Sequence, residues 1–126
     1  MDYIIKRNII SGYHRGNLLK FPTLNVRYHS YDYKKIGFGI WASLTKFKDN
    51  YCPSVTFAGN AVTFKNNSRI IETHLLDIKT LPSIKKIQIV FIKKIRKIKN
   101  FKNINALKLQ IAKDCIISKE ILSKYV

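Results

Sequence analysis

The stretch between residues 11 and 25 combines residue types that can bind phosphate. Gly12 and Gly16 leave room for an anion to approach the backbone, because glycine carries no side chain. Arg15 and Lys20 add positive charge to the same stretch. We therefore expect a loop here that could hold the phosphates of a nucleotide.

Thr23 and Asn25 follow this loop directly after Pro22, which fixes the backbone in front of them. They are two residues apart, so in an extended segment their side chains project from the same face. Both oxygens could then bind one cation or one phosphate. The alternative is an ordinary polar loop in which Thr and Asn bond to their own backbone, and spacing alone favours that alternative.

Glu72 lies in the middle of an apolar segment, residues 70–78. A buried carboxylate without partners would cost several kcal/mol, so Glu72 must face solvent, pair with a lysine, or line a cavity as a general base. The strand pattern alone favours a surface salt bridge. His74 is on the same face as Glu72, where a packed or hydrogen-bonded histidine is commoner than a ligand.

Short strands must position these residues. Aromatic and β-branched residues predict two strands, 38–47 and 51–58, joined in a hairpin by a turn at Asp49 and Asn50. Apolar and β-branched patterns predict further strands at 3–11, 70–78 and 85–96. Five or six strands followed by one helix favour an all-β fold, a small closed β-barrel with a helix packed on its outside or end.

The end of the chain changes its period. Asn103 is a plausible helix cap, and the apolar residues Ile104, Leu107 and Ile111 then recur at spacings of three and four. The pattern predicts a helix of about three turns ending near Asp114. A second short helix is expected over residues 118–125.

Composition limits the class of protein. The 126 residues carry 24 Lys and Arg against 7 Asp and Glu, a formal net charge of +17, with 46% hydrophobic residues. That length suits one domain, so we expect residues 1–126 to form a single unit. The positive charge fits two explanations equally well: a surface that binds phosphate, or codon bias in an A/T-rich genome, which enriches lysine on any surface. Cys52 and Cys115 stand far apart, outside any CxxC or Cys/His cluster, and are expected to be reduced thiols.

The longest apolar run, residues 87–92, is far shorter than the roughly 20 residues that span a bilayer. The first residues, MDYIIKRN, lack the apolar core of a signal peptide. We therefore expect a cytoplasmic protein with no membrane contact. We also expect it to be a monomer.

Several motifs together resemble the riboflavin kinase family. They are GYHRGNLLKFPTLN at 12–25, GIWA at 39–42, VTFAGNAVTF at 55–64, IIETHLLD at 70–77 and IRKIKNF at 95–101. They occur in the family's order over roughly residues 5–115. The Pro-Thr-x-Asn signature at 22–25 and the Glu-x-His at 72–74 are the strongest of them, and Arg96 followed by Phe101 adds a third.

This resemblance implies a six-stranded Greek-key β-barrel with a C-terminal helix, which transfers the γ-phosphoryl group of ATP to the 5′-hydroxyl of riboflavin and gives FMN. It implies that Thr23 and Asn25 coordinate Mg²⁺, or another divalent cation, and the nucleotide phosphates. Glu72 would accept the proton of the hydroxyl group. The remaining implied residues bind the nucleotide (Gly12, Arg15, Gly16, Lys20) or the flavin (Arg96, Phe101).

Bacterial members usually form the C-terminal half of a bifunctional protein whose other half makes FAD. The nearest approach to that half's His-x-x-His motif is at residues 14–17, which lack the second histidine, so we expect no FAD synthesis.

Two other functions stay open. Asn17, Lys20 and Leu24 differ from the family's usual residues, which would suit a flavin-binding or FMN-sensing module without catalysis. The net charge of +17 and the aromatic residues would suit a small barrel that binds single-stranded nucleic acid, but the motifs above favour small-molecule substrates over nucleic acid.

Overall fold

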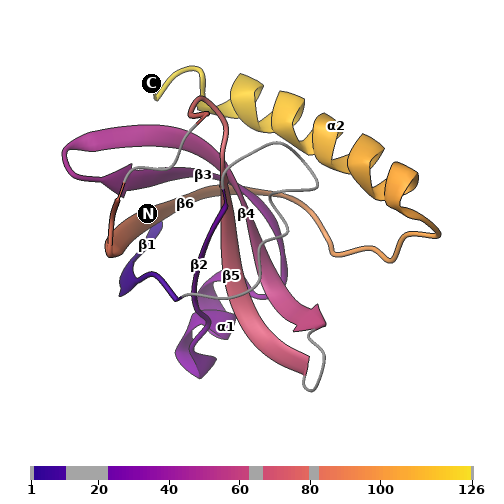
Figure 1. The fold of residues 1–126 in the computed structure, drawn as a ribbon, viewed down its shortest axis with the longest axis horizontal. Coiled ribbons are helices and arrows are strands. Elements are labelled where there is room, and N and C mark those ends of the chain that lie inside the picture. Colours follow the sequence, from indigo (N-terminus) through magenta and orange to yellow (C-terminus); the bar gives the residue numbers. More distant parts are fainter. Residues whose placement is uncertain (1, 11–22, 63–66, 80–82, 126) are drawn as a thin grey trace.

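The computed structural model describes residues 2–10, 23–62, 67–79 and 83–125, and the following concerns these residues. Six strands and a long C-terminal helix dominate them (Figure 1). The elements in chain order are β1 (Tyr3–Asn8), β2 (Thr23–Arg27), the 3-10 turn η2 (Ser30–Asp32), α1 (Tyr33–Ile36), β3 (Gly39–Phe47), β4 (Asn50–Val62), β5 (Asn67–Leu75), β6 (Lys86–Arg96) and α2 (Ile104–Leu122).

The strands form one antiparallel sheet in the order β1-β6-β3-β4-β5-β2. The sheet is curled, so its two edge strands approach each other (Figure 1). An isolated bridge pairs Ile9, just after β1, with Val26 of β2, and the Ile10 backbone N–H donates to the Asn25 carbonyl at 2.9 Å. The prediction of a six-stranded antiparallel structure with a C-terminal helix is confirmed, although the helix makes the fold mostly β rather than all-β.

The two faces of the sheet bury different side chains, because strand residues alternate between faces. On β5, Ile71 and Leu75 belong to the main apolar core on the inner face of the curl. Glu72 and His74 alternate with them and are also buried. These two lie on the face that α2 covers, called the helix face below.

Five hydroxyl groups form a closed ring of hydrogen bonds on the inner face. The ring joins fully buried side chains of three strands, and successive oxygens are 2.6–3.0 Å apart. Its members, in order, are Ser43, Ser54, Thr45, Thr73 and Thr56. Each hydroxyl can donate one bond and accept another, so the ring satisfies all five polar groups inside an apolar core.

Helix α2 begins where the sequence predicts, because the Asn103 side chain accepts a hydrogen bond from the Ala106 backbone N–H at 2.8 Å. The predicted end near Asp114 and the separate helix at 118–125 are both wrong, since one helix runs on to Leu122. No glycine or proline interrupts residues 114–122, and the buried positions 115, 118 and 122 continue the helical spacing.

The predicted hairpin of β3 and β4 is present, but its turn is Lys48–Asp49 rather than Asp49–Asn50. Asn50 pairs with Phe47 as the first residue of β4. Lys48 takes a positive φ of 56°, a conformation that glycine normally supplies in such a turn.

A buried carboxylate ties β1 to η2. Asp32 accepts hydrogen bonds from Arg7 at 2.6 and 2.7 Å, from the Tyr3 hydroxyl at 2.6 Å and from the His29 backbone N–H at 2.8 Å. Burial alone would raise the pKa of Asp32, but the hydrogen bonds from Arg7, Tyr3 and His29 outweigh it and hold the pKa below its ordinary value of 3.8.

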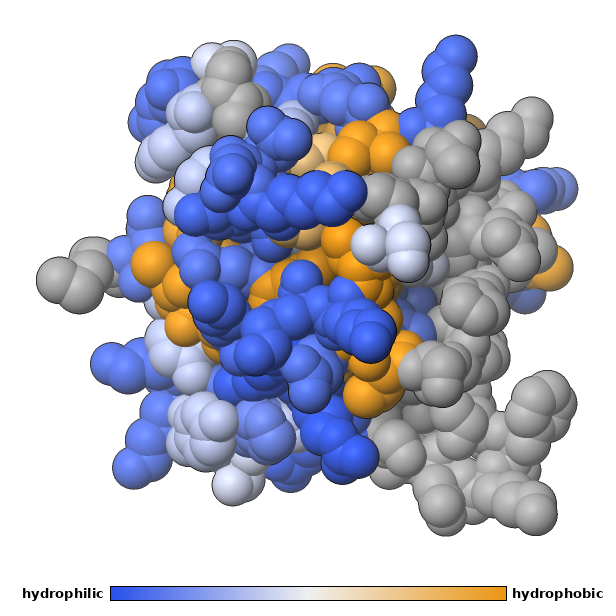
Figure 2. Space-filling view, turned by 60° about the vertical axis from the view of Figure 1, so that its left-hand side comes forward, coloured by the Kyte–Doolittle hydropathy of each residue, from blue (hydrophilic) through white to orange (hydrophobic). Residues whose placement is uncertain are grey.

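Cys52 and Cys115 are separate, buried free thiols, as expected from their spacing. Burial raises the pKa of both, that of Cys115 to about 11. On the face that Figure 2 shows, most of the coloured side chains are hydrophilic, with apolar side chains visible between them. Within the described residues, no helix is both long and apolar enough to span a bilayer.

Candidate functional site

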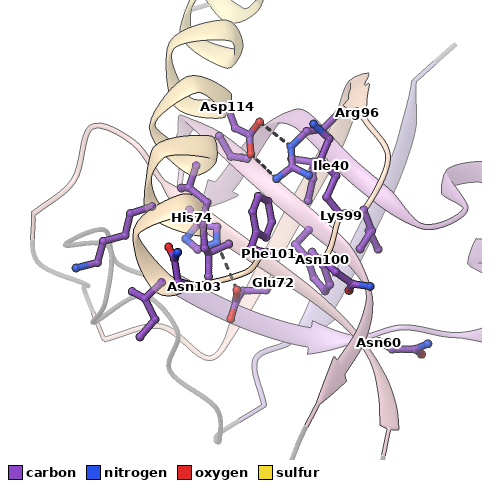
Figure 3. A pocket seen from close by; sticks show the side chains of 17 residues that line it. Ile40, Asn60, Glu72, His74, Arg96, Lys99, Asn100, Phe101, Asn103 and Asp114 are labelled. Carbon is purple, nitrogen blue, oxygen red and sulfur yellow. Dashed lines mark hydrogen bonds and ion pairs between the residues drawn. The ribbon is translucent and has the colours of Figure 1, made fainter.

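A pocket of about 440 Å³ lies between the helix face of the sheet, the first turns of α2 and the segment that joins β6 to α2 (Figure 3). Its walls are mainly apolar, with a few polar groups among them. The lining residues are Ile40, Val55, Phe57, Asn60, Glu72, His74, Arg96, Ile98, Lys99, Asn100, Phe101, Asn103, Ile104, Leu107, Lys108, Ile111 and Asp114. This volume and this mixture are typical of a site for a small organic molecule.

One row of cross-strand partners runs beneath this pocket. Asn25 of β2 is paired with Glu72, Glu72 with Phe57, Phe57 with Ile40, and Ile40 with Arg96. Directly paired residues of antiparallel strands point to the same face with Cβ atoms about 5 Å apart. The sheet register therefore brings residues from five separate segments of the sequence into one line.

A second row lies two residues further along the strands, where Thr23 is paired with His74 and His74 with Val55. Thr23 and Asn25 are both buried. They flank the pocket on its β2 side and are not among the residues that line it. The two oxygen-bearing side chains and the acid thus share one face of adjacent strands.

Glu72 is only 4% exposed. Its Oε1 lies 3.3 Å from Nε2 of His74, whose side chain is 7% exposed (Figure 3). The sequence pattern favoured a surface salt bridge for this residue, and that interpretation is wrong, because the charged group is buried beside a histidine. Among the described residues, His74 is the partner recorded for this carboxylate, which also lines the pocket, an arrangement that suits a general base.

Arg96 is held by the helix. Its Nε and Nη2 donate to the two carboxylate oxygens of Asp114 at 2.8 and 2.7 Å, and Nη1 donates to the Lys97 carbonyl at 3.0 Å. Gln110 donates to the same carboxylate at 3.1 Å. The guanidinium also lies over the Phe101 ring, 5.9 Å from its centroid. This bidentate pair fixes the connection between β6 and α2, and so the outer wall of the pocket.

Comparison with known proteins gives a family. The family model described as Flavokinase, riboflavin kinase, matches residues 1–122. The chain belongs to the riboflavin kinase family. The comparison with curated proteins finds no match.

Among solved structures, the chain is similar to one described as a macrolide-efflux protein from Streptococcus pneumoniae, with 16% identity and a TM-score of 0.74. The match covers 92% of this chain and 38% of that chain, so the present sequence spans well under half of its structural relative. At this identity, the likeness shows a shared fold and nothing further.

The family resemblance named nine site residues. Glu72, Arg96 and Phe101 line the pocket, and Thr23 and Asn25 lie on the neighbouring strand of the same face. The other four, Gly12, Arg15, Gly16 and Lys20, lie outside the described residues. The roles of all nine in a riboflavin kinase stay predictions.

Sequence reasoning missed Asp114 and the apolar wall formed by Ile98 and Leu107. Asp114 gave one usable signal: it is an acid in a lysine-rich helix, at the helical spacing from Leu107 and Ile111 that marks the buried side.

Within the described part of the chain, no group of three or more His, Cys, Asp or Glu side chains is placed to hold a metal ion.

Proposed function

We propose that this chain is a riboflavin kinase that transfers the γ-phosphoryl group of ATP to the 5′-hydroxyl of riboflavin. The observation that carries the proposal is the buried Glu72 at the floor of a pocket sized for a small molecule, in a chain of the riboflavin kinase family.

The flavin ring system would occupy the apolar part of the pocket, among Phe57, Phe101 and Leu107. Its ribityl chain would then extend towards Glu72 at the sheet. Arg96 would act mainly by holding Phe101 and the pocket wall, because three of its nitrogens already donate to Asp114 and Lys97.

In the proposed reaction the 5′-hydroxyl oxygen forms a bond to the γ-phosphorus, and the bond from that phosphorus to the β,γ-bridging oxygen breaks to release ADP. Glu72 takes the hydroxyl proton as the new bond forms. Phosphoryl transfer depends on positioning and on the neutralisation of charge rather than on covalent chemistry by the protein. A rigid strand residue that lines the pocket meets the first of these needs.

The nucleotide would lie on the β2 side, where Thr23 and Asn25 share a face with Glu72. Their hydroxyl and amide oxygens are hard donors that suit Mg²⁺ or a similar divalent cation. Such a cation would neutralise charge on the phosphates when bound. Four further residues are predicted to bind the nucleotide: Gly12, Arg15, Gly16 and Lys20. They come shortly before β2 in the sequence, which agrees with a nucleotide on the β2 side of the pocket.

We also propose that the curled sheet is a Greek-key barrel closed between β1 and β2. The strand order β6-β3-β4-β5 supports this, because a fourth strand returning beside the first of three hairpin-linked strands is the Greek-key arrangement. The Ile9–Val26 bridge supports closure.

The direct test incubates the chain with riboflavin, ATP and Mg²⁺ and measures FMN by chromatography. We expect FMN from the wild type and a fall in kcat of about 100- to 10,000-fold for Glu72→Gln, with little change in KM. Asp77→Asn is the matched control, because Asp77 follows the same strand with its side chain 60% exposed.

Two outcomes would count against the proposal. If folded wild-type protein forms no FMN, the chain is not a kinase, and retained riboflavin binding would then favour a flavin-binding module. If Glu72→Gln keeps full activity, the assigned base is wrong.

A further inference from the structure

The two ring nitrogens of His74 differ in their partners among the described residues. Nε2 lies 3.3 Å from the Glu72 carboxylate, while Nδ1 is buried without a hydrogen-bond partner among the described residues. The side chain is 93% buried, since 7% of its surface is exposed, and it lines the pocket. Figure 3 shows the imidazole beside Glu72, with the contact between them drawn as a dashed line.

A buried nitrogen without a partner costs about 1–3 kcal/mol, so native proteins rarely keep one. If the ring is neutral and Nε2–H donates to Glu72, Nδ1 carries a lone pair and needs a donor. If the ring is protonated, Nδ1–H needs an acceptor instead. Because His74 lines the pocket, a bound ligand is one source of the missing partner in both forms.

A hydroxyl group meets either requirement, because it can donate and accept. The proposed acceptor substrate carries a row of hydroxyls on its ribityl chain, and its terminal hydroxyl would face Glu72. His74 is two residues from Glu72 on the same face, about 7 Å along the strand. A polyol whose end reaches Glu72 therefore passes next to His74.

We propose that His74 is a positioning residue for the acceptor substrate, with Nε2 orienting the Glu72 carboxylate and Nδ1 bonding to a non-reacting hydroxyl of the ribityl chain. This inference rests on the proposed function and adds a specificity element to the same site. It makes recognition depend on the sugar-alcohol part of the ligand as well as on the flavin ring.

Two amide variants separate the roles of the two nitrogens. In His74→Gln the amide nitrogen can take the place of Nε2, whereas in His74→Asn the amide lies near the position of Nδ1. We expect His74→Gln to weaken riboflavin binding about tenfold, the loss of one hydrogen bond, with kcat nearly unchanged. We expect His74→Asn to lower kcat about tenfold with nearly unchanged KM, because Glu72 loses its orienting partner.

The binding arm uses fluorescence titration with riboflavin and with lumiflavin, which has the same ring system and no ribityl chain. His74→Gln should weaken riboflavin binding and leave lumiflavin binding unchanged. Asp77→Asn serves as the control for both ligands, and thermal melts confirm that each variant is folded.

Equal weakening for the two flavins, or none for riboflavin, would overturn the role of Nδ1. Equal kcat for His74→Asn and wild type would overturn the role of Nε2. These results differ from failure of the proposed function, in which the wild type itself forms no FMN. Wild-type protein that binds neither flavin would refute both.

Discussion

Replacement of Asp114 by asparagine should have two effects: it should loosen the wall of the pocket, and it should destabilise the fold. The Asp114 side chain is 2% exposed and accepts two hydrogen bonds from Arg96, whose own side chain is 14% exposed. Asparagine has nearly the same volume but only one acceptor oxygen and no charge. The substitution therefore leaves the guanidinium partly buried without its counter-charge.

The magnitude follows from the geometry. Removal of one partner of a buried ion pair costs about 3–5 kcal/mol. Because Arg96 keeps some exposure and its bond to the Lys97 carbonyl, we expect the lower end, about 3 kcal/mol. For 126 residues an unfolding entropy of about 2.1 cal/mol/K per residue converts this into a fall in Tm of about 11 °C.

Urea or thermal unfolding measures this loss, and riboflavin titration measures the effect on the pocket. The matched control is Asp77→Asn, which removes the exposed pair of Asp77 with Lys119 at 3.7 Å and should cost under about 1 kcal/mol. The double variant Arg96→Met/Asp114→Leu should regain most of the stability, because it removes both charges. Equal losses for Asp114→Asn and Asp77→Asn would refute the reasoning.

Three further predictions concern the core and the buried titratable groups. Thr73→Val breaks the hydroxyl ring and should cost about 1–3 kcal/mol in urea unfolding; a neutral effect would mean that the ring contributes nothing. The pKa of Asp32 is held below 3.8, so its contribution to stability is present above about pH 4 and is lost as the pH falls through its folded value; Asp32→Asn should flatten the acid limb of a pH–Tm curve, and parallel curves would contradict this. Raising the pKa of Cys115 from 9.0 to about 11 should slow alkylation at pH 7 about 100-fold relative to unfolded protein, and rapid labelling of the native chain would count against the burial of both thiols.

Most of the fold could be predicted from the segments in which apolar residues recur at regular spacing. The alternation in residues 85–96 predicted β6 to within one residue, and Asn103 predicted the start of α2. The apolar spacing predicts an end of α2 at Asp114, which is polar, but Asp114 is buried against Arg96 and the helix continues to Leu122. The hairpin turn lies one residue earlier than the sequence predicts. Lys48 adopts a positive φ there, and no glycine marks this position in the sequence.

The candidate site was only partly visible in the sequence. Two-residue spacing predicts that Thr23 lies on the same side as Asn25 and that Glu72 lies on the same side as His74, but it cannot predict that β2 pairs with β5. The sequence also does not predict the burial of Glu72, since residues 97–103, which line the same pocket, have no apolar periodicity.

Strand order, rather than any single motif, is what joins the parts of this site. Asn25 and Glu72 are 47 positions apart, yet the pairing of β2 with β5 sets them opposite each other. Arg96 enters the same row only because β6 lies beside β3, and Asp114 then links that row to the helix. A slip of one residue between β2 and β5 would turn Thr23 and Asn25 to the inner core and leave Glu72 without them. The inner face prevents such a slip, because Leu24 and Val26 are buried in its apolar core, so the packing that stabilises the sheet also fixes the register of the site.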